Sequence, residues 1–77
     1  MILFTAAWCT PCQQVKQYLQ EAYEGVLAVK VVDIDNDPEG LATKHKIKGI
    51  PTLIDDDKRV SYADAIKEHL EKVAREC

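Results

Sequence analysis

The sequence predicts a single α/β domain, spanning residues 1–77, with elements in the order β-α-β-α-β-β-α around a mixed four-stranded sheet. Short apolar runs typical of buried strands alternate with segments whose apolar residues recur at helical spacing. A helix joins the first two strands, so they should be parallel with a right-handed crossover. An acidic turn alone joins the last two strands, so they should be antiparallel. We expect helices on both faces of the sheet.

The first strand is predicted over Met1 to Thr5 and the first helix over about Thr10 to Glu24. Gly25, a residue type favoured just after a helix, marks the end of that helix. The second strand is predicted over about Leu27 to Ile34, a stretch rich in Val and Ile. The apolar residues that give the first helix its period are Val15, Tyr18, Leu19, Ala22 and Tyr23.

A short second helix is predicted over about Glu39 to Lys46. The turn Asp35-Asn36-Asp37-Pro38 precedes it, and proline is favoured in the first turn of a helix. Lys48-Gly49 ends this segment and leads to the third strand, over about Thr52 to Asp55.

The last part of the chain predicts a hairpin and a third helix. Asp55-Asp56-Asp57-Lys58 reads as the hairpin turn, with the fourth strand near Arg59 to Ser61. The third helix is predicted over about Tyr62 to Arg75, because apolar residues recur there at helical spacing. These residues are Ile66, Leu70, Val73 and Cys77.

Composition and charge narrow the class of protein. The 77 residues are 47% hydrophobic and 30% charged, with a formal net charge of −3, which is typical of a globular domain. A net negative charge argues against nucleic acid or an anionic membrane as the main partner. No apolar stretch approaches the roughly 20 residues of a membrane span. Met1 leads directly into a strand, with no signal-peptide pattern. The odd count of three cysteines suits a reducing compartment better than a secreted domain, so we expect a cytoplasmic protein, and we expect it to be a monomer.

Cysteine placement gives the strongest chemical signal. Cys9 and Cys12 lie two residues apart, behind Trp8 and around Pro11. Cys9 falls at or just before the first turn of the predicted helix, and Cys12 falls inside it. Free backbone N–H groups and the positive end of the helix dipole at that point favour the thiolate, which is the nucleophile. The pattern predicts a redox-active dithiol, with Cys9 exposed and Cys12 shielded.

Two other uses of this cysteine pair are less consistent with the sequence. A structural zinc ion needs about four ligands. The remaining candidates, His45, His69 and Cys77, make no second close pair, so we expect no metal and no cofactor. A purely structural disulfide between Cys9 and Cys12 would close a very short loop and would stabilise the fold little.

Three motifs lie at the ends of predicted strands: Trp8-Cys9-Thr10-Pro11-Cys12, Asp33-Ile34-Asp35 and Gly49-Ile50-Pro51-Thr52. On these motifs the chain resembles the thioredoxin family over essentially its whole length. Because the chain is short for a thioredoxin, the resemblance implies the compact, glutaredoxin-sized form of the fold. It also implies that the Ile50–Pro51 bond is the family's cis-proline bond, in a loop that faces the dithiol.

The resemblance implies a protein-disulfide reductase that serves electron transport and redox homeostasis. Cys9 would attack a substrate disulfide as the nucleophile, and Cys12 would resolve the mixed disulfide. Disulfide-containing proteins would be the substrates, and an upstream enzyme similar to thioredoxin reductase would supply the electrons. The substrate would contact five residues near the dithiol: Trp8, Thr10, Pro11, Ile50 and Pro51.

One departure from the family concerns proton transfer. The family's buried acid lies six residues before the first cysteine, a position that Leu3 occupies here, and the neighbouring lysine corresponds to Val31. This apolar pair predicts a drier core. We therefore expect resolution by Cys12 to be slower or more dependent on pH than in a typical thioredoxin.

Two rival functions remain open. A glutaredoxin-like enzyme would use glutathione, and Lys16 or Lys48 could contact a glutathione carboxylate. The acidic residues Asp55 to Asp57 would repel those carboxylates if they lay near the site. Alternatively, the chain could be a non-catalytic binding module that docks its partner on an apolar patch formed by Trp8, Pro11, Ile50 and Pro51. Cys77 is expected to act as a small hydrophobic residue, with an intermolecular thiol as the alternative.

Overall fold

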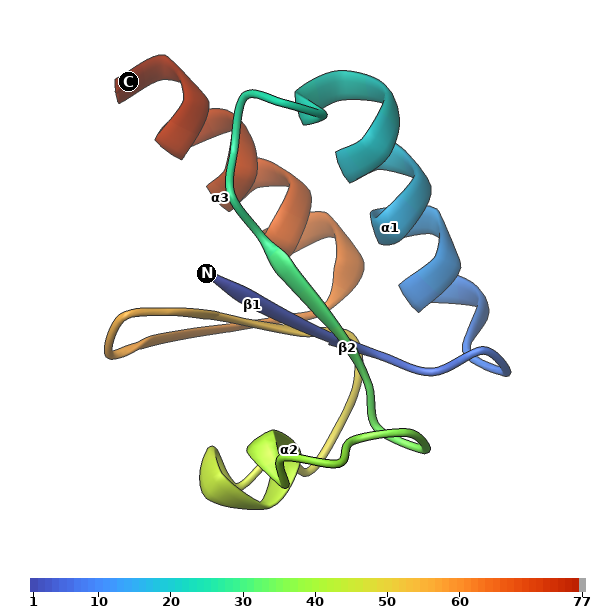
Figure 1. Cartoon of the computed structure of the whole chain (residues 1–77). Helices are drawn as coiled ribbons and strands as arrows, with labels where there is room; N and C mark the ends of the chain where they lie inside the picture. Colours follow the sequence, from blue (N-terminus) through green and yellow to red (C-terminus); the bar gives the residue numbers. More distant parts are fainter. Residues whose placement is uncertain (77) are drawn as a thin grey trace.

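The computed structural model describes residues 1–76, and within that range the elements follow the predicted order (Figure 1). The expectations for Cys77 therefore lie outside the described residues. The elements are β1 (Ile2–Thr5), α1 (Thr10–Tyr23), β2 (Lys30–Asp33), α2 (Leu41–Lys44), β3 (Thr52–Asp55), β4 (Lys58–Ser61) and α3 (Ala63–Glu76).

The sheet has the strand order β2-β1-β3-β4. β1 pairs in parallel with β2, where Thr5 lies opposite Asp33, and antiparallel with β3, where Phe4 lies opposite Thr52. β3 and β4 are antiparallel. Both predicted strand directions are therefore confirmed. The register brings the end of β1, the end of β2 and the start of β3 to one edge of the sheet.

Helices cover both faces of this mixed sheet, as predicted (Figure 1). Successive side chains of a strand point to opposite faces, so Leu3 and Phe4 of β1 belong to different cores. Leu3 packs with residues of α1 and α3, whereas Phe4 packs on the side of α2. The first core consists of Leu3, Val15, Leu19, Leu53, Ile66 and Leu70. The second consists of Phe4, Val32 and Ile54, with Leu41 and Ala42 of α2 against it.

α2 is shorter than the predicted Glu39 to Lys46, and it begins differently. Gly40, with φ 67°, precedes the helix in a left-handed conformation, so no helix can run continuously from Pro38. The start of α2 is fixed by the carboxylate of Asp37 and not by Pro38 in the first turn. This carboxylate accepts hydrogen bonds from the backbone N–H groups of Leu41 at 3.0 Å and Ala42 at 2.8 Å.

β2 is also shorter than predicted. The sequence favours a strand over Leu27 to Ile34, but the ladder begins at Lys30 because the partner strand begins there, at Ile2. The apolar residues Leu27 and Val29 instead pack against the core under α1 and α3. Their side chains are apolar for that reason and not because they belong to a strand.

The third helix begins one residue later than predicted. Tyr62, expected as its first residue, has φ 73° and is 79% exposed, so α3 starts at Ala63. The carbonyl of Tyr62 still accepts a hydrogen bond from the N–H of Ile66 at 3.0 Å. This turn links the end of β4 directly to the helix that covers the first core.

Asp37 makes the stability of the α2 segment depend on pH. Hydrogen bonds from the N–H groups of Ala42 and Leu41 hold the pKa of Asp37 below its usual range. A lowered folded-state pKa stabilises the protein above the unfolded-state value, about 3.9, and this contribution is lost as pH falls through the folded-state value. Asp37→Ala should therefore lower the urea midpoint at pH 7, and the difference from the wild type should shrink below about pH 4.

The matched control is Asp57→Ala, which removes an exposed carboxylate from the β3–β4 turn. Urea titrations at pH 7, 5 and 3, followed by circular dichroism, would compare the two variants. An equal loss of stability at all three values for Asp37→Ala would contradict the assignment of the capping carboxylate.

Candidate active site

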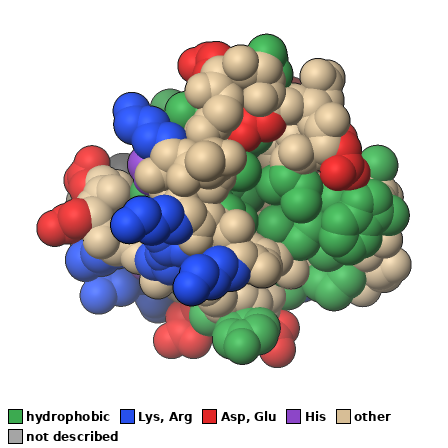
Figure 2. All heavy atoms as spheres, turned by 90° about the horizontal axis from the view of Figure 1, so that it is seen from below, with side chains coloured by type: hydrophobic (Ala, Val, Ile, Leu, Met, Phe, Trp, Pro, Cys, Tyr) green, Lys and Arg blue, Asp and Glu red, His purple; other side chains and the backbone are tan. Residues whose placement is uncertain are grey.

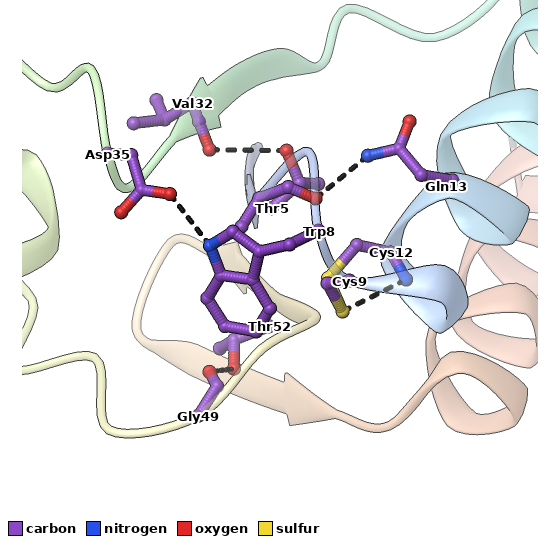
Figure 3. The surroundings of a disulfide bond; sticks show 10 residues. Thr5, Trp8, Cys9, Cys12, Gln13, Val32, Asp35, Gly49 and Thr52 are labelled. Carbon is purple, nitrogen blue, oxygen red and sulfur yellow. Dashed lines mark hydrogen bonds between the residues drawn. A yellow bond between two sulfur atoms is a disulfide. The ribbon is translucent and has the colours of Figure 1, made fainter.

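The two cysteines of the C-x-x-C motif lie at the start of α1, where β1 ends (Figure 3). Cys9 is the N-cap residue and is joined to Cys12 by a disulfide, with 5.2 Å between the Cα atoms. The backbone N–H of Cys12 donates to Sγ of Cys9 at 3.3 Å. Pro11 lies in the first turn. The helix therefore begins at the position that the sequence predicted, with a free backbone donor directed at the first sulfur.

The two cysteines differ in their exposure to solvent. Cys9 is 7% exposed and Cys12 is fully buried, so only Cys9 can be reached from solvent without movement of the chain. Together with Ala6 they form a small cluster, against which Ile34 and Ile50 pack. The sequence predicted an exposed Cys9, but its neighbours cover most of it.

Trp8 projects from the loop before the disulfide and is 68% exposed. Its indole Nε1 donates to Oδ2 of Asp35 at 2.7 Å, which fixes the ring over the end of β2 (Figure 3). The N–H of Asp35 in turn donates to Oδ1 of Asp33 at 2.9 Å. In the sequence, Asp35 stands out only as part of the Asp33-Ile34-Asp35 motif, which predicts no role for its side chain. Its position after the strand parallel to β1 was the signal that could have identified it.

An apolar groove of about 390 Å³ opens beside Trp8. Its lining comes from the loop before the disulfide, the end of β2, α2 and the loop before β3. Ile34 and Ile50 form part of this lining and also contact the cysteine cluster, so the groove leads to the disulfide. The lining residues are Trp8, Ile34, Ala42, Ile47, Lys48, Gly49 and Ile50.

The structure brings most of the predicted contact residues to this edge. Thr10 and Pro11 are exposed in the first turn of α1, and Ile50 is partly buried in the facing loop. The Ile50–Pro51 peptide bond is cis. Pro51 is buried, directly before β3, and its carbonyl accepts a hydrogen bond from the N–H of Tyr62 at 3.4 Å. It still lines a cavity beside Ile50.

Potential metal ligands are dispersed within residues 1–76. No group of three or more His, Cys, Asp or Glu side chains in that range is placed to hold a metal. Nε2 of His69 lies 2.9 Å from Oδ2 of Asp55, and His45 stacks at a tilt near Phe4. Among these residues, no helix is long and apolar enough to cross a membrane.

Comparison with known proteins gives the family of the chain. A family model described as Thioredoxin matches residues 1–76. The chain belongs to the thioredoxin family. Thioredoxins of Staphylococcus aureus strains N315 and MW2 are each 37% identical to it over 57 residues, which cover 70% of this chain and 54% of each relative. The chain thus spans about half the length of these relatives.

Leu3 and Val31, the two residues that depart from the thioredoxin pattern, differ in burial. Leu3 is fully buried in the core under α1 and α3. Val31 lies opposite Leu3 on β2, an edge strand of the sheet, and is 38% exposed. The predicted dry apolar pair is therefore wrong for Val31. Leu3 alone replaces the family's buried acid with a buried hydrocarbon.

The acidic turn that was expected to disfavour glutathione lies elsewhere. Asp56 and Asp57 follow the far end of β3, whereas Pro51 precedes its start. The four residues of β3 separate the two, and Asp55 pairs with His69. The charged side chain that lines the groove is that of Lys48. The repulsion of glutathione carboxylates by these acids therefore has no geometric basis.

The contact between Trp8 and Asp35 yields a direct test, because Trp8 is the sole tryptophan of the chain. Asp35→Ala removes the acceptor for the indole N–H, so the ring should move more freely and its steady-state fluorescence anisotropy should fall. Asp35→Asn keeps an acceptor oxygen and should retain most of the anisotropy. Equal anisotropy in all three proteins would contradict a role for Asp35 in fixing the ring.

Proposed function

We propose that this chain is a thiol–disulfide oxidoreductase that reduces disulfides in other proteins. The observation that carries the proposal is the environment of Cys9: its Sγ lies at the N-terminus of α1, accepts an N–H from Cys12, and adjoins an apolar groove. An N–H donor and the positive end of a helix dipole both favour a thiolate at this sulfur when the pair is reduced. The groove gives a substrate polypeptide a place to bind beside it.

The reaction consists of two exchanges. In the first, the Cys9 thiolate attacks one sulfur of the substrate disulfide; a bond forms between the two proteins, and the second substrate sulfur leaves as a thiolate that takes up a proton. In the second, Cys12 loses its proton and attacks Sγ of Cys9, which releases the remaining substrate sulfur as a thiol. The substrate gains two electrons and two protons, and Cys9 and Cys12 become the disulfide seen in the structure.

Substrate binding is assigned to both sides of the dithiol. Trp8 supplies a fixed aromatic surface, and Thr10 and Pro11 flank the attacking sulfur. Among the described residues, no backbone hydrogen bond uses the N–H or carbonyl of Ile50. An extended segment of substrate could therefore pair with Ile50 beside Pro51, as strands do when they add to a sheet edge.

The proposed partners follow from the direction of electron flow. A reducing site must itself be reduced after each turnover, and an enzyme similar to thioredoxin reductase would supply the two electrons. A reducing, cytoplasmic compartment is proposed for the same reason, since it keeps dithiols available.

The alternative function, a non-catalytic binding module, is supported by the exposed Trp8 and the apolar groove beside it. Cys9→Ser/Cys12→Ser separates the two, because only a binding module would keep its biological effect.

The roles of the two cysteines predict a trapping experiment. Cys12→Ser removes the resolving thiol, so Cys9 should remain joined to the substrate as a stable mixed disulfide. Cys9→Ser should give little or no such adduct, because Cys12 is fully buried. Mass spectrometry of each variant after incubation with a disulfide-containing protein measures the adduct. An adduct that forms through Cys12 and not through Cys9 would reverse the assignment.

Leu3 predicts a dependence of the second exchange on pH. With a hydrocarbon in place of the family's acid, the proton of Cys12 must pass to water or to the departing thiolate, so the release of substrate should accelerate as pH rises. Leu3→Asp should flatten this profile and accelerate release at pH 7, by up to about 100-fold if the carboxylate acts as a general base.

Leu3→Asn is the control, since it adds similar polarity to the core without a titrating group. Rapid-mixing measurements between pH 6 and 9 would give the release rate for each protein, with circular dichroism to establish that each variant is folded. Identical profiles for the wild type and Leu3→Asp would contradict the proposed importance of this position.

A further inference from the structure

A second groove, next to the apolar groove beside Trp8, is lined by cationic side chains. Lys46, Lys48 and Arg59 border a cavity of about 430 Å³, together with Gly49, Thr52 and Ser61. Figure 2 shows Lys and Arg side chains gathered on one face of the molecule, beside a region of hydrophobic side chains. The whole chain carries a formal net charge of −3, so this cationic groove is opposite in sign to the protein as a whole.

Within the part of the chain that the structure describes, no ion pair joins a cation of the cationic groove to a carboxylate. The ion pairs found there join Lys30 to Glu39 and His69 to Asp55, so none involves the groove. The guanidinium of Arg59 donates to the backbone carbonyls of His45 and Lys46, which are uncharged. These bonds fix the position of the cation without cancelling its charge.

The cationic groove is continuous with the dithiol site. An intermediate cavity of about 320 Å³ is lined by Lys48, Gly49, Ile50, Pro51, Thr52, Ser61 and Tyr62. Ile50 packs against the cysteine cluster, and Lys48 lines the cationic groove, the intermediate cavity and the apolar groove beside Trp8. A chain that pairs with the Ile50 backbone beside Cys9 would therefore continue onto Lys46 and Arg59.

We propose that the substrates of this site are polypeptide disulfides with acidic side chains near the reacting cysteine. These carboxylates would lie over Lys46, Lys48 and Arg59 while Cys9 attacks the substrate sulfur. The inference rests on the proposed function and specifies its substrate class. Opposite charges accelerate encounter and fix the register of the bound segment, and salt weakens this effect for exposed groups.

A polypeptide fits the arrangement better than glutathione does. Lys46 and Arg59 line the cationic groove but not the intermediate cavity that contains Ile50 and Pro51, so they lie beyond the residues next to the sulfurs. Both carboxylates of glutathione lie within one residue of its cysteine, whereas a longer chain can carry acids several residues away. Glutathione could reach Lys48 but would leave the other two cations unused.

The test compares three peptides that contain the same disulfide ring and differ only in four flanking residues, which are Glu, Gln or Lys. Each is reduced by the wild-type protein, with dithiothreitol as the electron source and peptide reduction by dithiothreitol alone subtracted. At low salt, kcat/KM for the Glu peptide should exceed that for the Gln peptide by about threefold to tenfold, since exposed charge pairs are individually weak. The ratio should approach 1 in 0.5 M salt.

Lys46→Gln/Lys48→Gln should bring the ratio of Glu to Gln peptide close to 1 at low salt. The matched control Lys72→Gln/Arg75→Gln removes the same charge from α3, around a different cavity, and should keep the wild-type ratio. Arg59 is left unchanged because it also holds two carbonyls in place. Glutathione disulfide is included as a fourth substrate.

Equal reduction of the Glu, Gln and Lys peptides would overturn this inference and leave the proposed function standing. A preference for glutathione disulfide that disappears in Lys46→Gln/Lys48→Gln would overturn it in favour of a glutathione site. An equal loss of the ratio in the α3 control would also overturn it, because net charge and not the cationic groove would then be responsible. Reduction of none of the substrates would overturn both proposals.

Discussion

The site depends on the pairing of β1 with a parallel strand on one side and an antiparallel strand on the other. Because β2 runs with β1 and β3 runs against it, the end of β1, the end of β2 and the start of β3 meet at one edge. The disulfide follows the first, Asp35 follows the second, and the Ile50–Pro51 loop precedes the third. Three segments far apart in the sequence thus surround one pair of sulfurs.

Burial of β1 on both faces makes this arrangement stable. Leu3 and Phe4 are both fully buried, one under α1 and α3 and the other under α2. Any shift of register by one residue would exchange their faces and would separate the three loops. The same strand carries a buried Leu3 at the position of the thioredoxin family's buried acid. Under the proposed mechanism, this one residue therefore bears both on core packing and on the release of the Cys12 proton.

The sequence predicted well those features that depend on local pattern. The apolar runs and helical spacing predicted the element order and strand directions, and the C-x-x-C motif predicted the start of α1. The bounds of two elements were predicted wrongly, for different reasons. Leu27 and Val29 are apolar because they pack on a core built from distant segments, not because they extend β2. The late start of α2 has a local cause, since Asp37 caps the helix and Gly40 precedes it in a left-handed conformation, and neither effect is visible in the hydrophobic pattern.

Functional residues could be predicted where they form a contiguous motif and could not where the fold brings distant residues together. The cysteines and Trp8 could be found in the sequence because they form a contiguous motif. The hydrogen bond from Trp8 to Asp35 could not, because it joins residues 27 positions apart. The cationic groove could not be predicted either. Arg59 lies on β4, whereas Lys46 and Lys48 lie in the loop between α2 and β3.

The reduction potential of the Cys9–Cys12 pair tests the central claim, that the site donates electrons to protein disulfides, most directly. Equilibration of the protein in buffers of defined dithiol potential, with the thiol content read by alkylation and mass spectrometry, would give the value. The account predicts a potential near or below about −230 mV, in the range of reducing members of such exchange systems. A potential near −180 mV or above would contradict it, because the pair would then accept electrons from its partners.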